Sequence, residues 1–215
     1  MTFKILTDST ADLPESWTQE HDVQVLGLTI QLDGQTYETV GPDKLTSEQL
    51  LAKMESGSKP TTSQINVGQF EDVFRQYAQE GTAVLYVAFA SALSGTYQSA
   101  VMAREMVLED YPEAIITILD TKAASMGEGI LVMKAVEARA AGQSLEQTAD
   151  LLQSLVPRVQ TYFLVDDLNH LMRGGRISKA AALMGSLVNI KPIIAVTADG
   201  SLDSVAKVRG KKKAQ

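Results

Sequence analysis

The sequence VLYVAFASALSGT, residues 84–96, carries the clearest signal of the fold in this chain. Its first part, residues 84–90, is an uninterrupted apolar run of the length that predicts a buried strand. Its last part ends in Ser94, Gly95 and Thr96, residue types that precede or open a helix. A strand that turns directly into a helix aims backbone N–H groups and hydroxyls at one spot, which suits an anion or a carboxylate.

A second hydroxyl-rich loop, KPTTSQ at residues 59–64, precedes a predicted helix over residues 66–79. The hydroxyl groups of the two loops belong to Thr62, Ser63, Ser94 and Thr96. Helix capping alone explains any one of them, because Ser and Thr are preferred caps that contribute about 1 kcal/mol each. Their recurrence in two loops favours a shared ligand site, and one loop can serve both purposes.

Strands and helices alternate over residues 1–158, which predicts an α/β domain with a parallel sheet and helices on its faces. The ligand crevice of such a sheet lies at the carboxyl ends of its strands. The expected strands cover residues 4–6, 23–30, 84–90 and 114–119, with a hairpin of residues 28–32 and 35–38 around Asp33-Gly34. The expected helices begin near Asp12, with Asp12 or Ser9 as cap, and then cover residues 46–54, 66–79, 96–110, 127–141 and 145–155.

After Pro157 the pattern changes, and we expect residues 159–215 to form the start of a second α/β domain. The expected elements are a strand at 161–165, helices at 167–172 and 179–188, and a hairpin of residues 191–197 and 201–208. The chain stops directly after this hairpin. We therefore expect the second domain to be incomplete, as if truncated at its C-terminal end.

The composition argues against several classes of function. A net charge of −7 over 215 residues disfavours a general nucleic-acid role, since such a surface repels phosphate. The absence of Cys excludes disulfides, thiolate metal sites and a Cys nucleophile. No apolar run reaches the ~18 residues of a spanning helix, and the first residues lack an apolar signal core. We therefore expect a cytoplasmic protein without stable membrane insertion.

Motifs for metal binding and catalysis are weak. His21 and His170 do not stand in a metal-ligand spacing, so we expect no metal. The chain has no G-x-x-x-x-G-K-[ST] phosphate loop and no G-x-S-x-G elbow at Ser94. A phosphoryl-transfer or hydrolytic enzyme that uses Ser94 with Asp8 or Asp120 is therefore the less favoured alternative.

The segment Arg173-Gly174-Gly175-Arg176 leaves two interpretations open. It is either a solvated turn or a clamp in which two Arg flank a turn and bind an anion or a carboxylate of a docking partner.

Five motifs, in this order and at this spacing, resemble the DegV family over the whole chain. They are TDSTADLP (7–14), KPTTSQ (59–64), SALSGTYQSA (91–100), DT (120–121) with ASMG (124–127), and LMRGGRIS (171–178) followed by Lys191-Pro192. The resemblance implies a DegV-like fold and a protein that holds one long-chain fatty acid in an internal tunnel, without catalysis or a cofactor of its own. It also implies a partner fatty-acid kinase, to which the carboxylate is presented. A lipid-sensing regulator is a further alternative.

The resemblance also assigns residues. In that family a Thr of the Thr-Ser-Gln motif and the Ser of Ser-Gly-Thr-Tyr hold the carboxylate, and these correspond to Thr62 and Ser94. The secondary ligand-site candidates are Ser9, Thr61, Ser63, Gly95, Thr96, Ser125 and Met126. The candidates for partner docking are Arg173 and Arg176.

Family members continue for several tens of residues past the segment that corresponds to residues 207–211, so we expect parts of the tunnel wall to be missing. Met126, Ile130, Met184, Leu187 and Ile194 are of the type that would line such a tunnel, although we favour ordinary core packing for each.

Overall fold

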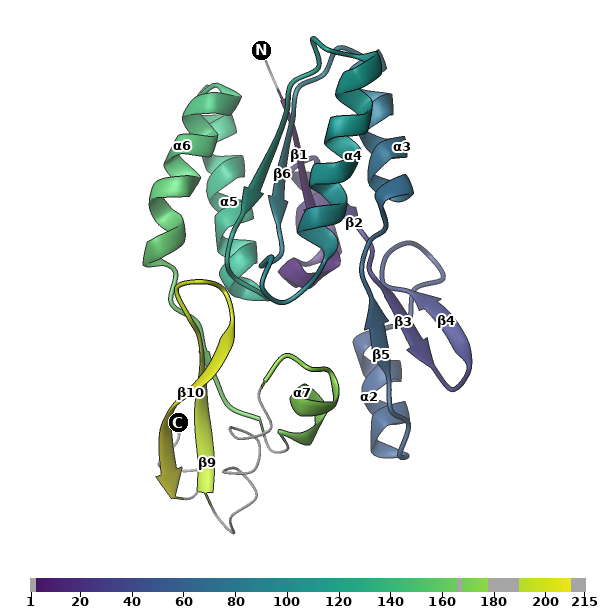
Figure 1. The fold of residues 1–215 in the computed structure, drawn as a ribbon, viewed down its shortest axis with the longest axis vertical. Coiled ribbons are helices and arrows are strands. Elements are labelled where there is room, and N and C mark those ends of the chain that lie inside the picture. The colour runs from purple at the N-terminus through teal and green to yellow at the C-terminus, as the bar shows by residue number, and fades with distance from the viewer. Residues whose placement is uncertain (1–2, 166–167, 178–189, 210–215) are drawn as a thin grey trace.

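The computed structural model describes residues 3–165, 168–177 and 190–209 (Figure 1). The expected helix over residues 179–188, with Met184 and Leu187, lies outside the described residues.

A parallel sheet forms the centre of the molecule. Its four strands run in the order β2-β1-β6-β7, and each neighbouring pair is parallel. The strands are β1 (Lys4–Asp8), β2 (Val23–Leu26), β6 (Val84–Ala88) and β7 (Ile116–Asp120). Ser9 follows β1, Thr121 follows β7, and Ser91 lies three residues after the end of β6, so the predicted parallel sheet is confirmed and polar residues stand near these strand ends.

Helices cover both faces of this sheet (Figure 1). Alternate residues of each strand point to opposite faces, so Ile5 and Leu85 belong to one apolar cluster and Leu6 and Tyr86 to another. The first cluster is completed by α5 (Met126–Ala140) and α6 (Leu145–Leu155), and the second by α3 (Val67–Gln79) and α4 (Thr96–Asp110). Burial on both faces explains why these strands read as continuous apolar runs.

Side-chain caps define where three of the helices begin. Thr46, Asn66 and Ser144 each form a capping box with a Gln three residues later, at the starts of α2 (Ser47–Glu55), α3 and α6. The expected cap at Asp12 or Ser9 was wrong. Pro14 is the N-cap of α1 (Glu15–Glu20) and makes no side-chain cap bond, whereas residues Ser9–Ala11 form the short helix η1, which Asp8 caps.

The prediction of one strand over residues 23–30 was also wrong. The chain leaves β2 at Leu26, passes Gly27, and enters β3 (Thr29–Leu32), which lies in a separate antiparallel sheet. A Cβ at Gly27 would lie 2.7 Å from Cγ2 of Val40, so the two segments pack too closely there for a larger residue. This second sheet also contains the predicted partner β4 (Gln35–Glu38) and the unexpected strand β5 (Thr61–Ser63), in the order β4-β3-β5.

A third, antiparallel sheet follows η2 (Val156–Arg158). It consists of β8 (Tyr162–Phe163), β9 (Ile190–Val196) and β10 (Leu202–Arg209), and the predicted hairpin of β9 with β10 is confirmed. The short helix α7 (Asn169–Arg173) lies between this hairpin and α2 in Figure 1. Within the described ranges, every helix is too short or too polar to cross a membrane.

Candidate functional site

A cavity of ≈ 480 Å³ lies where β1 and β6 end, and we call it the strand-end cavity. Thr10, Phe89, Leu93 and Ser94 line it from the loops that follow β1 and β6. The second sheet and α2 supply an apolar wall, which consists of Leu28, Ile30, Leu50 and Met54. The KPTTSQ segment completes the lining together with residues 170–176, which include most of α7 and the turn after it and which we call the α7 turn. Segments that are far apart in the sequence therefore enclose one space (Figure 1).

The two hydroxyl-rich loops are joined to each other directly. The amide Nε2 of Gln64 donates to Oγ of Ser99 at 2.9 Å, and its side chain lies over Gly95, where a Cβ would be 2.1 Å from Oε1 of Gln64. The backbone N–H of Ile65 also donates to Oγ1 of Thr96 at 3.4 Å. These contacts hold Thr62 and Ser94 in the lining of the same cavity.

Thr62 and Ser94 differ in what their hydroxyl groups already bind. Thr62 is exposed on β5, and its side chain has no hydrogen-bond partner among the residues that the structure describes. Oγ of Ser94 accepts the backbone N–H of Thr96 at 3.2 Å and shares a hydrogen bond of 2.9 Å with Oγ1 of Thr96. Ser94 therefore supports the start of α4, whose N-cap is Gly95, and also lines the cavity, so a local structural role and a place in the site coexist at this residue.

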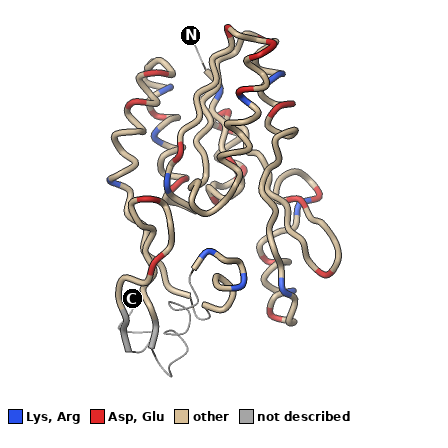
Figure 2. Tube along the Cα trace, in the orientation of Figure 1, with Lys and Arg blue, Asp and Glu red and all other residues tan. Residues whose placement is uncertain are grey.

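The electrostatic character of the strand-end cavity is cationic. Lys59, Arg173 and Arg176 line it together with His170, and none of the described lining residues is Asp or Glu. Figure 2 shows blue segments and no red along the α7 turn. Arg176 Nε donates to the carbonyl oxygen of Leu93 at 3.1 Å, which attaches this turn to the Ser94 loop. Arg173 and Arg176, the candidates for partner docking, thus belong to the cavity lining.

The structure separates the secondary candidates. Thr61 lines the strand-end cavity, whereas Ser63, Gly95 and Thr96 do not. Thr96 is fully buried behind the cavity, where its hydroxyl meets Ser94 and the backbone of Ile65.

Ser125 and Met126 lie at the start of α5, away from the described lining of the strand-end cavity. Oγ of Ser125 donates to Oδ2 of Asp12 at 2.6 Å, and Met126 is exposed. We favoured core packing for Met126, Ile130 and Ile194. Of these three, only Ile194 is buried in an apolar cluster, whereas Met126 and Ile130 are exposed.

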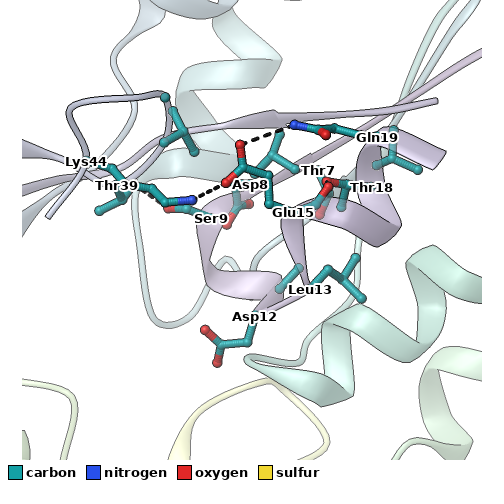
Figure 3. Close-up of a pocket in the computed structure, with 15 residues that line it drawn as sticks. Thr7, Asp8, Ser9, Asp12, Leu13, Glu15, Thr18, Gln19, Thr39 and Lys44 are labelled. Atoms are coloured by element: carbon teal, nitrogen blue, oxygen red, sulfur yellow. Dashed lines mark hydrogen bonds and ion pairs between the residues drawn. The ribbon is translucent and has the colours of Figure 1, made fainter. Parts of the chain in front are cut away.

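Ser9 and Asp8 line a second, smaller cavity of ≈ 260 Å³, which we call the side cavity (Figure 3). Its polar lining includes Lys44 and Gln19, both of which contact the carboxylate of Glu15 (Figure 3). Oγ of Ser9 accepts one hydrogen bond from the backbone N–H of Leu28 at 3.1 Å and another from the hydroxyl of Thr39 at 2.8 Å. The Ser9 hydroxyl therefore fixes the chain where β3 begins.

Thr10 and Phe89 form the floor of the strand-end cavity, and Asp8 lies behind this floor. Its carboxylate is fully buried and accepts the backbone N–H groups of both residues at 3.1 Å. Burial raises the pKa of Asp8, while hydrogen bonds from Thr10, Tyr86 and Phe89 oppose that rise. The sequence indicated a polar strand end here but not this double attachment.

Sequence reasoning missed most of the apolar wall. Leu50 and Met54 lie four residues apart on α2, a helix none of whose residues is buried, and a wider search for one-sided apolar spacing would have found them. Ile30 and Leu28 were missed because the break at Gly27, after which Leu28 lies between the sheets and Ile30 in the second sheet, has no signature beyond the glycine itself.

The alternative enzyme geometry receives no support from the contacts. Asp8 binds Thr10, Tyr86 and Phe89, and Asp120 binds Ser91 and Lys122, so neither aspartate contacts Ser94. Among the residues that the structure describes, no group of three or more His, Cys, Asp or Glu is placed to hold a metal ion.

Comparisons with known proteins agree with this architecture. A DegV domain-containing protein of Streptococcus pyogenes serotype M1 is 57% identical over 214 residues, which is 100% of this chain and 75% of the relative. A stearic-acid-binding protein from Eubacterium ventriosum superposes with a TM-score of 0.90 at 32% identity, over 99% of this chain and 72% of that one. A fatty-acid-binding DegV family protein from Thermus thermophilus superposes with a TM-score of 0.85 at 36% identity, over 100% of this chain and 74% of that one.

The sequence model of the DegV family matches residues 2–215. The match includes the KPTTSQ loop and the SALSGTYQSA loop that enclose the strand-end cavity. The fold, the relatives and the motifs lead to one conclusion: the chain belongs to the DegV family.

Proposed function

We propose that this protein binds a long-chain fatty acid in the strand-end cavity, with the carboxylate held by Thr62 and Ser94. The observation that carries the proposal is the composition of the lining. Two hydroxyl-bearing loops and three Lys or Arg side chains face the same space as an apolar wall, without a described acidic residue. An amphipathic anion matches such a surface, since its head group meets donors and its chain meets Leu, Ile and Met side chains.

The energetics favour an acyl chain over a short acid. Burial of each CH₂ contributes about 0.8 kcal/mol, so a chain of ~16 carbons supplies on the order of 10 kcal/mol before the costs of association. The head group then needs only hydrogen bonds that fix its orientation. The hydroxyls of Thr62, whose side chain has no partner within the described part of the chain, and of Ser94, just before α4, supply them, with the N-terminal end of that helix adding a favourable field.

The solved relatives from Eubacterium ventriosum and Thermus thermophilus bind fatty acids, which supports the same ligand class here. We also propose that the protein acts in the cytoplasm as a binding subunit and presents the carboxylate to a separate fatty-acid kinase. Arg173 and Arg176 line the cavity, which supports the proposal that they dock the partner or attract the negative charge that a phosphate donor brings. We also propose that residues 159–215 belong to the start of a second α/β domain.

Native and denaturing mass spectrometry test the binding step. We expect protein purified from cells to carry a co-purified fatty acid, and delipidated protein to take up palmitate or oleate. Thr62→Val should weaken uptake by about tenfold through loss of a hydrogen bond to a charged group, and Met126→Gln, which is exposed outside the described cavity lining, is the matched control. Absence of both co-purified and added fatty acid would overturn the proposal.

A reconstitution tests the kinase step separately. With ATP and a purified fatty-acid kinase, the loaded protein should yield acyl phosphate, and the loaded protein alone should yield none. Binding without acyl phosphate formation would favour the lipid-sensing regulator. Turnover by the chain alone, abolished by Ser94→Ala, would favour the enzyme alternative.

A further inference from the structure

Asp8 is surrounded by hydrogen-bond donors. Oδ1 accepts the backbone N–H of Thr10 at 3.1 Å and its hydroxyl at 2.5 Å. Oδ2 accepts the hydroxyl of Tyr86 at 2.7 Å and the backbone N–H of Phe89 at 3.1 Å. Two of these four donors are backbone N–H groups, one on each oxygen, and such groups cannot act as acceptors. An ionised carboxylate satisfies all four donors at once.

Glu128 meets the opposite situation. Its side chain is fully buried on α5, and its two oxygens contact only hydroxyl groups among the described residues, Thr7 Oγ1 at 3.1 Å and Thr10 Oγ1 at 2.8 Å. Each of these hydroxyls has another acceptor within reach. Thr7 lies 3.0 Å from the carbonyl oxygen of Val87, and Thr10 lies 2.5 Å from Oδ1 of Asp8.

The number of protons decides the charge state of Glu128. Two threonine hydroxyls carry one proton each, yet they take part in four contacts with acceptors. If Glu128 were ionised, two of these contacts would have no proton. A proton on Glu128 supplies a third donor and turns one repulsive contact into a hydrogen bond.

Electrostatics points in the same direction. Burial raises the pKa of Glu128 well above its usual value, and the charge of Asp8 raises it further, with a smaller effect from Asp12, while the hydrogen bonds with Thr10 and Thr7 oppose the rise. The titratable groups that act on this carboxyl are therefore Asp8 on β1, Asp12 after η1 and, through Asp8, Tyr86 on β6, whose own pKa is raised well above its usual value by burial. Two buried carboxylates bridged by one hydroxyl do not both ionise.

We propose that Asp8 and Glu128 hold a single proton between them, carried by Glu128, and that this pair positions Thr10 and Phe89 in the floor of the strand-end cavity. Asp8 is a positioning residue that ties the loops after β1 and β6 together, and Glu128 stays neutral so that only one negative charge lies behind the cavity. The role in ligand binding rests on the proposed function, whereas the protonation state does not.

NMR of protein labelled with ¹³C at the glutamate side-chain carboxyl tests the protonation state. We expect one glutamate to keep the chemical shift of a protonated carboxyl through neutral pH, and that signal to disappear in Glu128→Gln. The proposal is overturned if every glutamate titrates in the ordinary range, or if the protonated signal persists in the variant.

Palmitate binding by the same variants tests the positioning role. Glu128→Gln keeps a neutral group of the same shape and should bind within about twofold of the wild type, whereas Asp8→Asn should lose about tenfold because its NH₂ must face a backbone N–H. If Asp8→Asn fails to fold, Thr10→Val removes the bridging hydroxyl and should weaken binding similarly.

The pH profile of binding separates the two roles. Affinity of the wild type should fall as pH rises through the titration of Glu128, and Glu128→Gln should lack that step. Equal pH profiles for the two proteins would overturn the positioning role. Failure of the wild type to bind palmitate would instead refute the proposed function, and the NMR result would still decide the protonation state.

Discussion

The side chain of Gln64 lies directly against Gly95, so close that a Cβ on the glycine would be 2.1 Å from Oε1 of Gln64. Gln64 comes from the end of one hydroxyl-rich loop and Gly95 from the start of the helix after the other, and the same amide donates to Ser99 at 2.9 Å. The glycine is needed for close approach and not for its backbone conformation, because its φ of −71° suits any residue. This contact brings the two loops to one cavity.

Substitution of Gly95 by Ala should therefore push the Gln64 side chain away and break its bond to Ser99. We expect a loss of about 1 kcal/mol in the free energy of unfolding, the usual value of one hydrogen bond. Urea denaturation of Gly95→Ala, Gln64→Ala and the double variant measures the coupling. The double variant should lose clearly less than the sum of the two single losses, and strict additivity would contradict the contact.

Thr62 and Ser94 should differ in stability although both are proposed to bind the ligand. Ser94→Ala removes the acceptor of the Thr96 N–H at the start of α4 and should cost about 1 kcal/mol. Thr62→Val, on an exposed strand position without a described side-chain partner, should change stability by less than about 0.5 kcal/mol. Thermal unfolding of the ligand-free proteins checks this, and equal losses in the two variants would contradict the assigned contacts.

Gly129 should tolerate no side chain. A Cβ there would lie 2.6 Å from the carbonyl oxygen of Ala11, so Gly129→Ala forces α5 away from η1 and should cost roughly 1–3 kcal/mol. Gly68→Ala on α3 is the matched control, because its nearest contact is a side-chain oxygen at 3.3 Å, and it should stay within about 1 kcal/mol of the wild type. Comparable losses in both variants would count against the close packing of α5.

The stability of the protein should decline as pH rises above the usual pKa of a glutamate, 4.5, because folded Glu128 keeps a proton that the unfolded chain releases. The contribution of Glu128 is complete below that value and is lost as pH rises toward the raised pKa of the folded state. Glu128→Gln should remove this dependence, which amounts to about 1.4 kcal/mol per pH unit for one proton. Urea denaturation between about pH 5 and pH 7 measures the slope, with the exposed Glu113→Gln as control, and an unchanged slope in Glu128→Gln would refute the raised pKa.

The alternation of strands and helices could be read from the chain because each signal is local. Residues 84–88 form a buried strand as their apolar run predicts, and a helix begins after Thr46 in the range expected for residues 46–54. The two hydroxyl-rich loops also stood out, since Ser, Thr and Gly cluster at expected strand and helix ends.

The features that local signals missed depend on packing between distant segments. Residues 23–30 are apolar enough for one strand, but the close approach of Val40 to Gly27 divides them between two sheets. Thr61–Ser63 forms a strand by antiparallel pairing with β3, a segment about 30 positions earlier in the chain, so its strand character depends on a distant partner.

The chain on its own therefore predicted the parallel α/β layers and the two hydroxyl-rich loops, because period, caps and turn residues act within a few positions of each other, and the resemblance to the DegV family then singled out Thr62 and Ser94. Only the folded molecule showed how that pair is held. Gln64 donates a hydrogen bond to Ser99, 35 positions later in the chain. Thr10 links Asp8 to Glu128, which lies 118 positions after Thr10. Contacts of that kind, and the burial that sets the charge of Glu128, form only when the helices pack against the sheet. A local sequence pattern therefore does not predict them.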